Sequence, residues 1–370
     1  MKHKIIRACT ISYSWDFVEN MLPELKKQYE VVLLSSPGHE LDEVEEKYGV
    51  RGIRVPMERH IAPKQDLISL CRLVKTFRKE KPRMVHSMTP KAGLLCMMAA
   101  WLARVPVRVH TFTGLVFPTA TGLKKRILMF TDWLTCACAT HVIPEGKGVM
   151  ADLRNNGITK KPMKVLGDGS VKGIDLKLFH GRRNADRSEK FTFLFVGRIV
   201  RDKGINELVE AYVGLNQQYT DCRLVLVGPF EDDLDPISAK TRQMIETCPG
   251  IEVVGEKLGD ELVDYYAAAD CYVFPSYREG FPNTVLEAGA MGLPCIVTDI
   301  NGSREIIEEG RNGVVIPPRD ASALYQAMER MLTDTEMRER MATNARASIA
   351  SRFDQDFVRQ YLLNFYAEIL

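Results

Sequence analysis

The stretch that decides the fold reads Asp270-Cys-Tyr-Val-Phe-Pro-Ser276, closely followed by Arg278-Glu-Gly-Phe-Pro-Asn-Thr-Val-Leu-Glu-Ala288. Its first part is typical of a buried strand that ends at its proline. Pro282 suits the first position of a helix, because the N–H group that proline lacks has no helical partner there. Gly292 and Pro294 then end the helix. The stretch therefore predicts a strand, a loop and a helix start, as in doubly wound α/β folds.

Two carboxylates, Glu279 and Glu287, lie eight positions apart across this loop and helix. Unpaired N–H groups of Asn283 and Thr284, with the positive end of the helix dipole, favour a diphosphate. Glu287 can accept hydrogen bonds from two ribose hydroxyls, and Glu279 can reach a sugar. The pattern thus indicates a nucleotide-sugar site. The alternative is a surface loop whose acidic residues only decorate a helix start.

The composition is that of an ordinary globular protein of two domains: 370 residues, 45% hydrophobic and 26% charged. Its nine cysteines include no CxxC pair, so we expect reduced, mostly buried thiols in a cytosolic protein. Residues 1–7 lead into a first strand without the apolar core of a secretion signal. The most apolar window, 92–107, is too short to span a bilayer and is expected to be a core helix.

The charge is distributed unevenly. Residues 1–180 hold 29 Lys and Arg against 17 Asp and Glu, whereas the remainder holds 21 against 31. A basic first half suggests an anionic partner there, either membrane lipid head groups or a phosphate-bearing substrate. Nucleic acid is not expected, because no nucleic-acid-binding motif appears. The alternative is a solvated surface with no such partner.

Short β-rich runs alternate with helical patterns, which predicts an α/β protein. The expected strands of the first half are 5–11, 30–35, 52–55, 84–86, 108–111 and 140–143. The polar stretch 181–190 is the expected linker. The expected strands of the second half are 191–196, 223–227, 251–254, 271–274, 294–298 and 313–316. We therefore predict two doubly wound domains with a cleft between them.

A second constellation follows the first strand of the second half: Gly197-Arg-Ile-Val-Arg-Asp-Lys-Gly204, with a helix over 205–215. Glycines allow close backbone approach, and Arg198 and Lys203 supply two cations for a diphosphate. They would stabilise a departing nucleoside diphosphate. The alternative is an ordinary strand-to-helix turn with solvated basic residues.

Two histidines lie at expected strand ends. His110 can bond a sugar hydroxyl or help to activate an acceptor, or it can be a hydrogen-bonded core residue. His86 is interpreted as structural or on the acceptor side. Near the start of another helix, the backbone N–H groups of Gly302 and Ser303 can reach the same ligand as the first motif, but Ser303 is interpreted as a cap.

For two amphipathic segments the sequence pattern does not decide what each apolar face packs against. Residues 119–134 combine three cations, Lys124, Lys125 and Arg126, with an apolar face. We expect the apolar face to pack in the core and the three cations to contact an anionic membrane surface. In the last segment Phe357, Tyr361, Leu362, Phe365 and Ile369 fall near one helical face, which caps the second domain or crosses back to the first. No metal site is expected, because no DxD-type pair ends a strand and Asp232-Asp233 reads as solvated.

Together these motifs resemble the retaining glycosyltransferases of family 4, which have the GT-B fold. The likeness covers the whole second half through 197–204, 279–287 and 302–305. It extends to Val109-His110-Thr111 and to 169–175, which is similar to the family's "NGVD" segment. Within the family the chain most resembles bacterial enzymes that build capsule, O-antigen or glycoprotein glycans on a polyprenyl diphosphate carrier.

The resemblance implies a role for each matching residue. Arg198, Lys203, Glu279 and His110 would form the catalytic set, with the cations on the donor diphosphate and His110 at the reaction centre. Glu287 would hold the ribose. The other donor-binding residues would be Gly197, Gly280, Phe281, Pro282, Asn283 and Thr284.

The resemblance also implies an activity and a location. The chain would be a metal-independent hexosyl- or N-acetylhexosaminyltransferase, with a nucleotide sugar, expected to be UDP-linked, as co-substrate and no resident cofactor. The acceptor would be a lipid-linked sugar, reached from the cytoplasmic face of the membrane by a peripheral, basic N-terminal domain. Expected domains are 1–182, with helix 353–370 returning to it, and 190–352.

Two features depart from the family pattern, and two other functions stay open. Thr10-Ile-Ser-Tyr-Ser-Trp-Asp16 stands where many members carry a glycine-rich loop, and Lys172 replaces the asparagine of "NGVD". The alternatives are a nucleotide-sugar epimerase of the same fold and a non-catalytic nucleotide-sugar-binding subunit.

Overall fold

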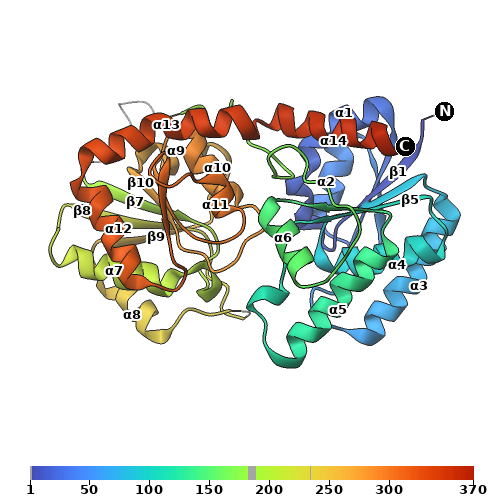
Figure 1. Ribbon diagram of the computed structural model, residues 1–370, viewed down its shortest axis with the longest axis horizontal. Helices are drawn as coiled ribbons and strands as arrows, with labels where there is room; N and C mark the ends of the chain where they lie inside the picture. The colour runs from blue at the N-terminus through green and yellow to red at the C-terminus, as the bar shows by residue number, and fades with distance from the viewer. Residues whose placement is uncertain (1, 182–188, 234) are drawn as a thin grey trace. The chain divides into compact units, whose positions relative to one another are not determined.

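The computed structural model describes residues 2–181, 189–233 and 235–370 (Figure 1). By its internal contacts the chain forms two compact units. Unit 1 comprises residues 1–172 and 356–370, and unit 2 comprises residues 173–355. The expected domain bounds of 1–182 and 190–352 remain predictions, and most of the expected linker, 182–188, lies outside the described residues.

Unit 1 contains a parallel sheet of six strands in the order β3-β2-β1-β4-β5-β6. The order reverses direction between β1 and β4, which is the arrangement of a doubly wound sheet. The strands are β1 (Lys4–Ala8), β2 (Glu30–Ser35), β3 (Arg51–Arg54), β4 (Met84–Ser87), β5 (Val107–Phe112) and β6 (His141–Pro144).

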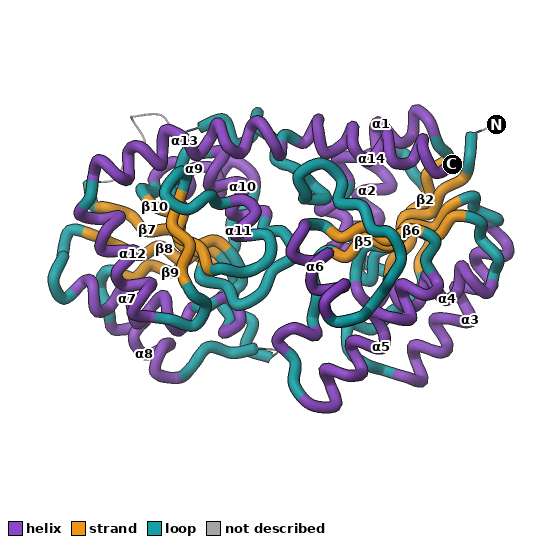
Figure 2. The backbone as a smooth tube through the Cα atoms, viewed as in Figure 1, coloured by secondary structure: helices purple, strands orange, loops and turns teal. Residues whose placement is uncertain are grey.

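Helices cover both faces of the unit 1 sheet, as Figure 2 shows. Along β1, Ile6 and Ala8 face one apolar cluster and Ile5 faces another, because successive side chains alternate across a strand. Both faces are therefore buried, which explains the nearly continuous apolar strands. The helices are α1 (Leu22–Gln28), α2 (His39–Tyr48), α3 (Pro63–Glu80), α4 (Pro90–Leu102), α5 (Gly122–Cys138), α6 (Lys147–Asn155) and α14 (Gln355–Ile369), with 3₁₀ turns η1 (Ser12–Phe17), η2 (Glu19–Met21) and η3 (Phe117–Thr119).

Unit 2 repeats this topology, with six parallel strands in the order β12-β11-β10-β7-β8-β9. Its strands are β7 (Phe191–Val196), β8 (Cys222–Val227), β9 (Ile251–Gly255), β10 (Cys271–Phe274), β11 (Cys295–Thr298) and β12 (Gly313–Ile316). Its helices are α7 (Ile205–Asn216), α8 (Ala239–Thr247), α9 (Gly259–Ala268), α10 (Asn283–Ala290), α11 (Ser303–Ile306), α12 (Ala321–Thr333) and α13 (Thr335–Phe353), with the 3₁₀ turn η5 (Arg201–Lys203).

The predicted α/β class and the existence of all twelve expected strands are confirmed. The largest difference at a strand end is in β1, which stops at Ala8 rather than residue 11. The apolar window 92–107 forms most of α4, a helix of the unit 1 core. Within the described residues, no helix has the length and apolar character needed to cross a bilayer.

Two expectations about helix faces are corrected. On α5, Leu128, Met129 and Leu134 pack against the core, but Leu123 and Phe130 are 73% and 58% exposed. The expected core face is therefore only one of two apolar faces of that helix.

On α14, the buried face is Val358, Leu362, Leu363, Phe365 and Tyr366. Phe357 and Tyr361 were expected on this face and are exposed. The helix packs within unit 1 from residue 356 onward.

Candidate active site

The site of unit 2 lies where its strand order reverses, between the adjacent strands β7 and β10. Ligands of open parallel sheets bind at this point, outside the carboxyl ends of the strands. The loop after β7 and the loop after β10 meet there directly. Gly204 has a φ of +72°, and a Cβ atom at this position would lie 2.1 Å from the carbonyl oxygen of Pro275. Only glycine permits this contact between the two loops.

Lys203 and Glu279 form an ion pair across these two loops. Their side chains are 18% and 16% exposed, so water screens the pair only partly. The Ser276 hydroxyl donates a hydrogen bond to Glu279 Oε1 at 2.7 Å, and Lys203 Nζ lies 5.1 Å from the centre of the Phe274 ring. The structure thus brings together a predicted cation and a predicted carboxylate that are 76 positions apart in the chain.

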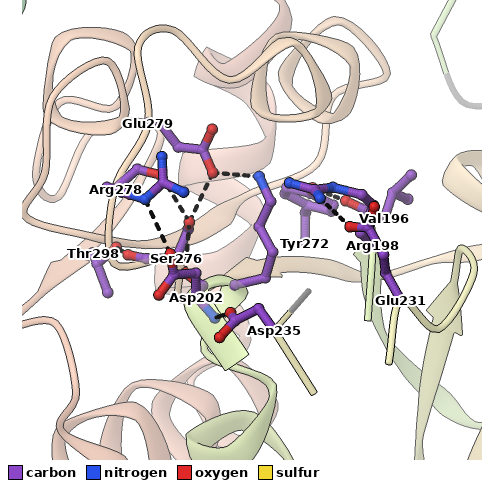
Figure 3. A network of polar contacts seen from close by, with 11 residues as sticks. Val196, Arg198, Asp202, Glu231, Asp235, Tyr272, Ser276, Arg278, Glu279 and Thr298 are labelled. Atoms are coloured by element: carbon purple, nitrogen blue, oxygen red, sulfur yellow. Dashed lines mark hydrogen bonds and ion pairs between the residues drawn. The ribbon is translucent and has the colours of Figure 1, made fainter. Parts of the chain in front are cut away.

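Arg198 is the more exposed of the two predicted cations, at 48%, and it pairs with Glu231 (Figure 3). Among the described residues, Arg198 therefore pairs with a different carboxylate from the one that Lys203 contacts. Both arginine and lysine nevertheless lie on the loop that leaves β7. Gly197, between β7 and Arg198, has a φ of +149°, and its carbonyl oxygen lies where a side chain on Gly228 would be.

Asp202 fixes the two loops to each other, a role that the sequence pattern did not indicate. Its carboxylate accepts a hydrogen bond from Arg278 Nε at 3.0 Å (Figure 3). Its carbonyl oxygen accepts from the Tyr277 N–H at 2.8 Å. Its own N–H donates to the Asp235 carboxylate at 2.7 Å. The only signal in the sequence is an acid placed between Arg201 and Lys203, which is not specific.

Helix α10 begins one residue later than expected, at Asn283, with Pro282 as its N-cap. The Pro282 carbonyl accepts the first helical hydrogen bonds, from Val285 and Leu286. The N–H groups of Asn283 and Thr284 precede these bonds and match the predicted anion-facing donors. Asn283 Oδ1 is buried and has no hydrogen-bond partner within the described residues. Buried amide oxygens usually accept a hydrogen bond, so a ligand or a water molecule is expected to supply the N–H or O–H group here.

The loop 280–282 is held from behind by the start of α11. A Cβ atom on Gly302 would lie 2.5 Å from the Gly280 carbonyl oxygen and 2.8 Å from Phe281 Cα. The N-cap of α11 is Gly302, so the interpretation of Ser303 as the cap is wrong. Ser303 is instead the first helical residue, and its buried hydroxyl has no partner in the described part of the chain.

Glu287 lies on the first turns of α10 and is half-buried. Its Oε2 accepts a hydrogen bond from the Tyr266 hydroxyl at 2.8 Å. Burial and the nearby carboxylate raise the pKa of Tyr266 well above its usual range, so this hydroxyl remains a donor. Tyr266 therefore orients the carboxylate that was predicted to bind a ribose. Sequence reasoning missed this tyrosine, which lies on the helix preceding β10.

His110 belongs to unit 1 and is 1% exposed. Its Nδ1 lies 2.8 Å from Ser87 Oγ, and burial lowers the pKa of His110 to about 3, so the ring is neutral at pH 7. These contacts agree with the second alternative for His110, a hydrogen-bonded core residue. The catalytic role of His110 stays a prediction. His86 likewise bonds inside unit 1, to Tyr366 at 2.5 Å and to Thr111 at 2.7 Å.

Trp15, the bulky departure from a glycine-rich loop, does not project from its loop. It is fully buried in unit 1, and its indole N–H donates to Ser35 Oγ at 3.2 Å. The strand-order reversal of unit 1 is lined instead by Thr10 and Thr89, whose hydroxyls lie 2.6 Å apart. Within the described residues of both units, no group of three His, Cys, Asp or Glu side chains is placed to hold a metal ion.

The chain is similar to several known proteins. Family profiles described as "Glycosyl transferases group 1" and "Glycosyl transferase 4-like domain" match residues 179–348 and 14–169. The Staphylococcus aureus capsular polysaccharide biosynthesis glycosyltransferase CapM is 29% identical over 376 residues, which cover 99% of this chain and 97% of CapM.

Two further relatives agree with these matches. The Escherichia coli UDP-Gal:alpha-D-GlcNAc-diphosphoundecaprenol alpha-1,3-galactosyltransferase is 30% identical over 325 residues, 82% of this chain and 80% of that enzyme. The crystal structure of Anabaena HepE in complex with UDP has the same fold, with a TM-score of 0.80 at 18% identity over 100% of both chains.

Proposed function

Since this chain belongs to the family 4 glycosyltransferases, retaining enzymes of the GT-B fold, we propose that it transfers a sugar from a UDP-sugar to a saccharide on a lipid diphosphate carrier. The names of the S. aureus and E. coli relatives support a role in bacterial capsule or related glycan assembly. The UDP bound to HepE supports a uridine nucleotide as the donor's leaving group.

One observation carries the donor site: Lys203 and Glu279 pair at the strand-order reversal of unit 2, beside the start of α10. We assign the donor diphosphate to Arg198, Lys203 and the N–H groups at the start of α10. A diphosphate there gains two cations and a helix N-terminus, which together stabilise developing negative charge. Asn283 Oδ1, which has no partner among the described residues, is available to accept from a donor hydroxyl.

Glu287 is assigned to the ribose hydroxyls, with Tyr266 fixing its carboxylate. Glu279 is assigned to the donor sugar, where its bond to Ser276 holds one oxygen in place. Gly197, Gly280 and Phe281 shape the loops around it. In the reaction the bond from the sugar's anomeric carbon to the diphosphate oxygen breaks. The acceptor hydroxyl oxygen bonds to that carbon from the same face and gives its proton to the leaving diphosphate.

The acceptor side is assigned to unit 1, with neutral His110 at the reaction centre as the family resemblance implies. We place the enzyme in the cytoplasm, bound peripherally to the inner face of the cytoplasmic membrane. The excess of 29 basic over 17 acidic residues in positions 1–180 supports contact with anionic lipid.

Steady-state kinetics with a UDP-sugar panel and a lipid-linked acceptor, in EDTA, test these roles. We expect transfer with retained configuration. Glu287→Ala is expected to raise mainly the donor KM, whereas Arg198→Ala and Lys203→Ala also lower kcat, because they act on charge that develops in the transition state. Equal, modest effects of all three variants would contradict the assignment. Altered sugar released from the donor without an acceptor would indicate an epimerase, and UDP binding without turnover would indicate a binding subunit.

A further inference from the structure

Helix α5 of unit 1 has a second apolar face that the unit does not bury. Its inner face packs on the core through Leu128, Met129 and Leu134. Its outer face carries four large apolar side chains that are between 39% and 73% exposed: Leu123, Ile127, Phe130 and Trp133. Positions three and four apart lie on one side of a helix, so these residues form a continuous stripe.

The stripe is ordered as well as exposed. The rings of Phe130 and Trp133 stack, with centroids 5.6 Å apart and planes 25° apart. From Leu123 to Trp133 the stripe runs for about 15 Å, at 1.5 Å per residue. Helix α5 packs beside α4 on one face of the sheet, which leaves its outer face at the surface of unit 1 (Figure 1). A stripe of this size is typical of an interaction site rather than of scattered exposed residues.

Three cations begin the same helix, where a helix dipole disfavours positive charge. They are Lys124, Lys125 and Arg126, and the first turn of α5 contains no acidic residue. Within the described residues, none of the three has an assigned ion-pair partner. Among the described residues, therefore, no acidic partner offsets the cost of these charges next to the positive end of α5. An anionic surface outside the protein would offset it.

We propose that the outer face of α5 docks onto an anionic lipid bilayer, with the stripe inserted among the head groups and the cations on lipid phosphates. An apolar stripe beside unpaired basic residues is the pattern by which amphipathic helices lie in a membrane interface. The choice of a lipid surface rests on the proposed function, because a lipid-linked acceptor is reached at the membrane. A second copy of the chain fits less well, since the cations of two identical faces would repel each other.

The test is co-sedimentation with vesicles of phosphatidylcholine alone or with 30% phosphatidylglycerol, without donor or acceptor. We expect binding that requires the anionic lipid and weakens as salt rises. Each of Lys124→Gln and Arg126→Gln is expected to weaken binding about fivefold, because one cation near the surface contributes about that factor. Phe130→Ser combined with Trp133→Ser is expected to weaken it at least tenfold.

Phe357→Ser is the matched control, because Phe357 in α14 is 48% exposed, like Trp133, but lies outside the stripe. It should bind vesicles as the unchanged protein does. A stripe variant that keeps full vesicle binding would overturn the proposal. So would an unchanged protein that forms a dimer through the stripe, shown by a dimer in sedimentation that Phe130→Ser abolishes.

The vesicle assay contains no nucleotide, so its outcome is separate from that of the transfer assay. Vesicle binding without glycosyl transfer would leave the docking surface standing and contradict the proposed function. If the protein transfers sugar to a water-soluble acceptor but does not bind vesicles, the glycosyltransferase activity would stand and the docking surface would be contradicted.

Discussion

Gly204 is the point where the two loops of the candidate site touch, so Gly204→Ala tests how that site is held together. The residue has a φ of +72°, and an added Cβ would lie 2.1 Å from the Pro275 carbonyl oxygen. Gly310→Ala is the control, because Gly310 has a φ of +75° and no atom within 4 Å of an added Cβ. Both changes place an alanine in the left-handed region, which costs free energy of folding, but only Gly204→Ala also brings a Cβ atom against the Pro275 carbonyl oxygen.

The magnitudes follow from that difference. A left-handed alanine costs roughly 1–2 kcal/mol, and the stiffer unfolded chain offsets about 0.4–1 kcal/mol of this. Gly310→Ala should therefore lower the free energy of unfolding by about 1 kcal/mol. Gly204→Ala adds overpacking against backbone, about 1–3 kcal/mol, for a total loss of about 2–4 kcal/mol.

Guanidinium titrations followed by circular dichroism measure these losses. All three tryptophans lie in unit 1, so tryptophan fluorescence in the same titration follows that unit separately. We also expect Gly204→Ala to weaken UDP binding about tenfold, because Lys203 adjoins Gly204 and a displaced loop misplaces its charge. Equal losses of stability in the two variants, with equal UDP affinity, would refute the reasoning.

Three further predictions concern other contacts. Glu231 forms an exposed ion pair with Arg198 that contributes about 0.2–1 kcal/mol and competes with a bound diphosphate. Glu231→Gln removes this competition and should tighten UDP binding up to about fivefold in calorimetry, and weaker binding would contradict the prediction. Burial raises the pKa of Asp132 to about 7, so the folded protein holds this proton more tightly and loses stability as pH rises from about 4 to 7. Asp132→Asn should remove that slope and add at most about 4 kcal/mol at pH 8, and an unchanged slope in denaturation at pH 5 and 8 would exclude the effect. Tyr366→Phe leaves His86 Nδ1 without its partner and should cost about 1–3 kcal/mol in denaturation, against less than about 0.5 kcal/mol for the exposed Tyr361→Phe.

The fold was predictable because most of its strands are short, buried apolar runs between turn residues, as β7 and β10 are. The edge strands β3 and β9 contain no buried residue, so their positions followed from the alternation of β-rich and helical segments instead. The site loops followed from the same pattern, since Lys203 and Glu279 come directly after two of these runs. That β7 and β10 are neighbours depends on strand order, which no local pattern contains.

The residues that support the site were not predictable, because they act through tertiary contacts. Asp202 and Tyr266 take their roles from partners that are 21 or more positions away. Trp15 belongs to the segment that stands in place of the family's glycine-rich loop, and its burial depends on the packing of unit 1 rather than on that local sequence. For α5, one apolar face was expected, and it was expected in the core; only the packing shows that Leu123, Ile127, Phe130 and Trp133 stay exposed.

The central claim is that unit 2 binds a uridine diphosphate at the reversal between β7 and β10. Calorimetric titration of UDP in EDTA tests it most directly, with Glu287→Ala as the site variant and Glu246→Ala, an exposed change on α8, as the control. We expect saturable binding that is at least about tenfold weaker in Glu287→Ala and unchanged in Glu246→Ala. No binding by the unchanged protein, or equal affinity in all three proteins, would contradict the account.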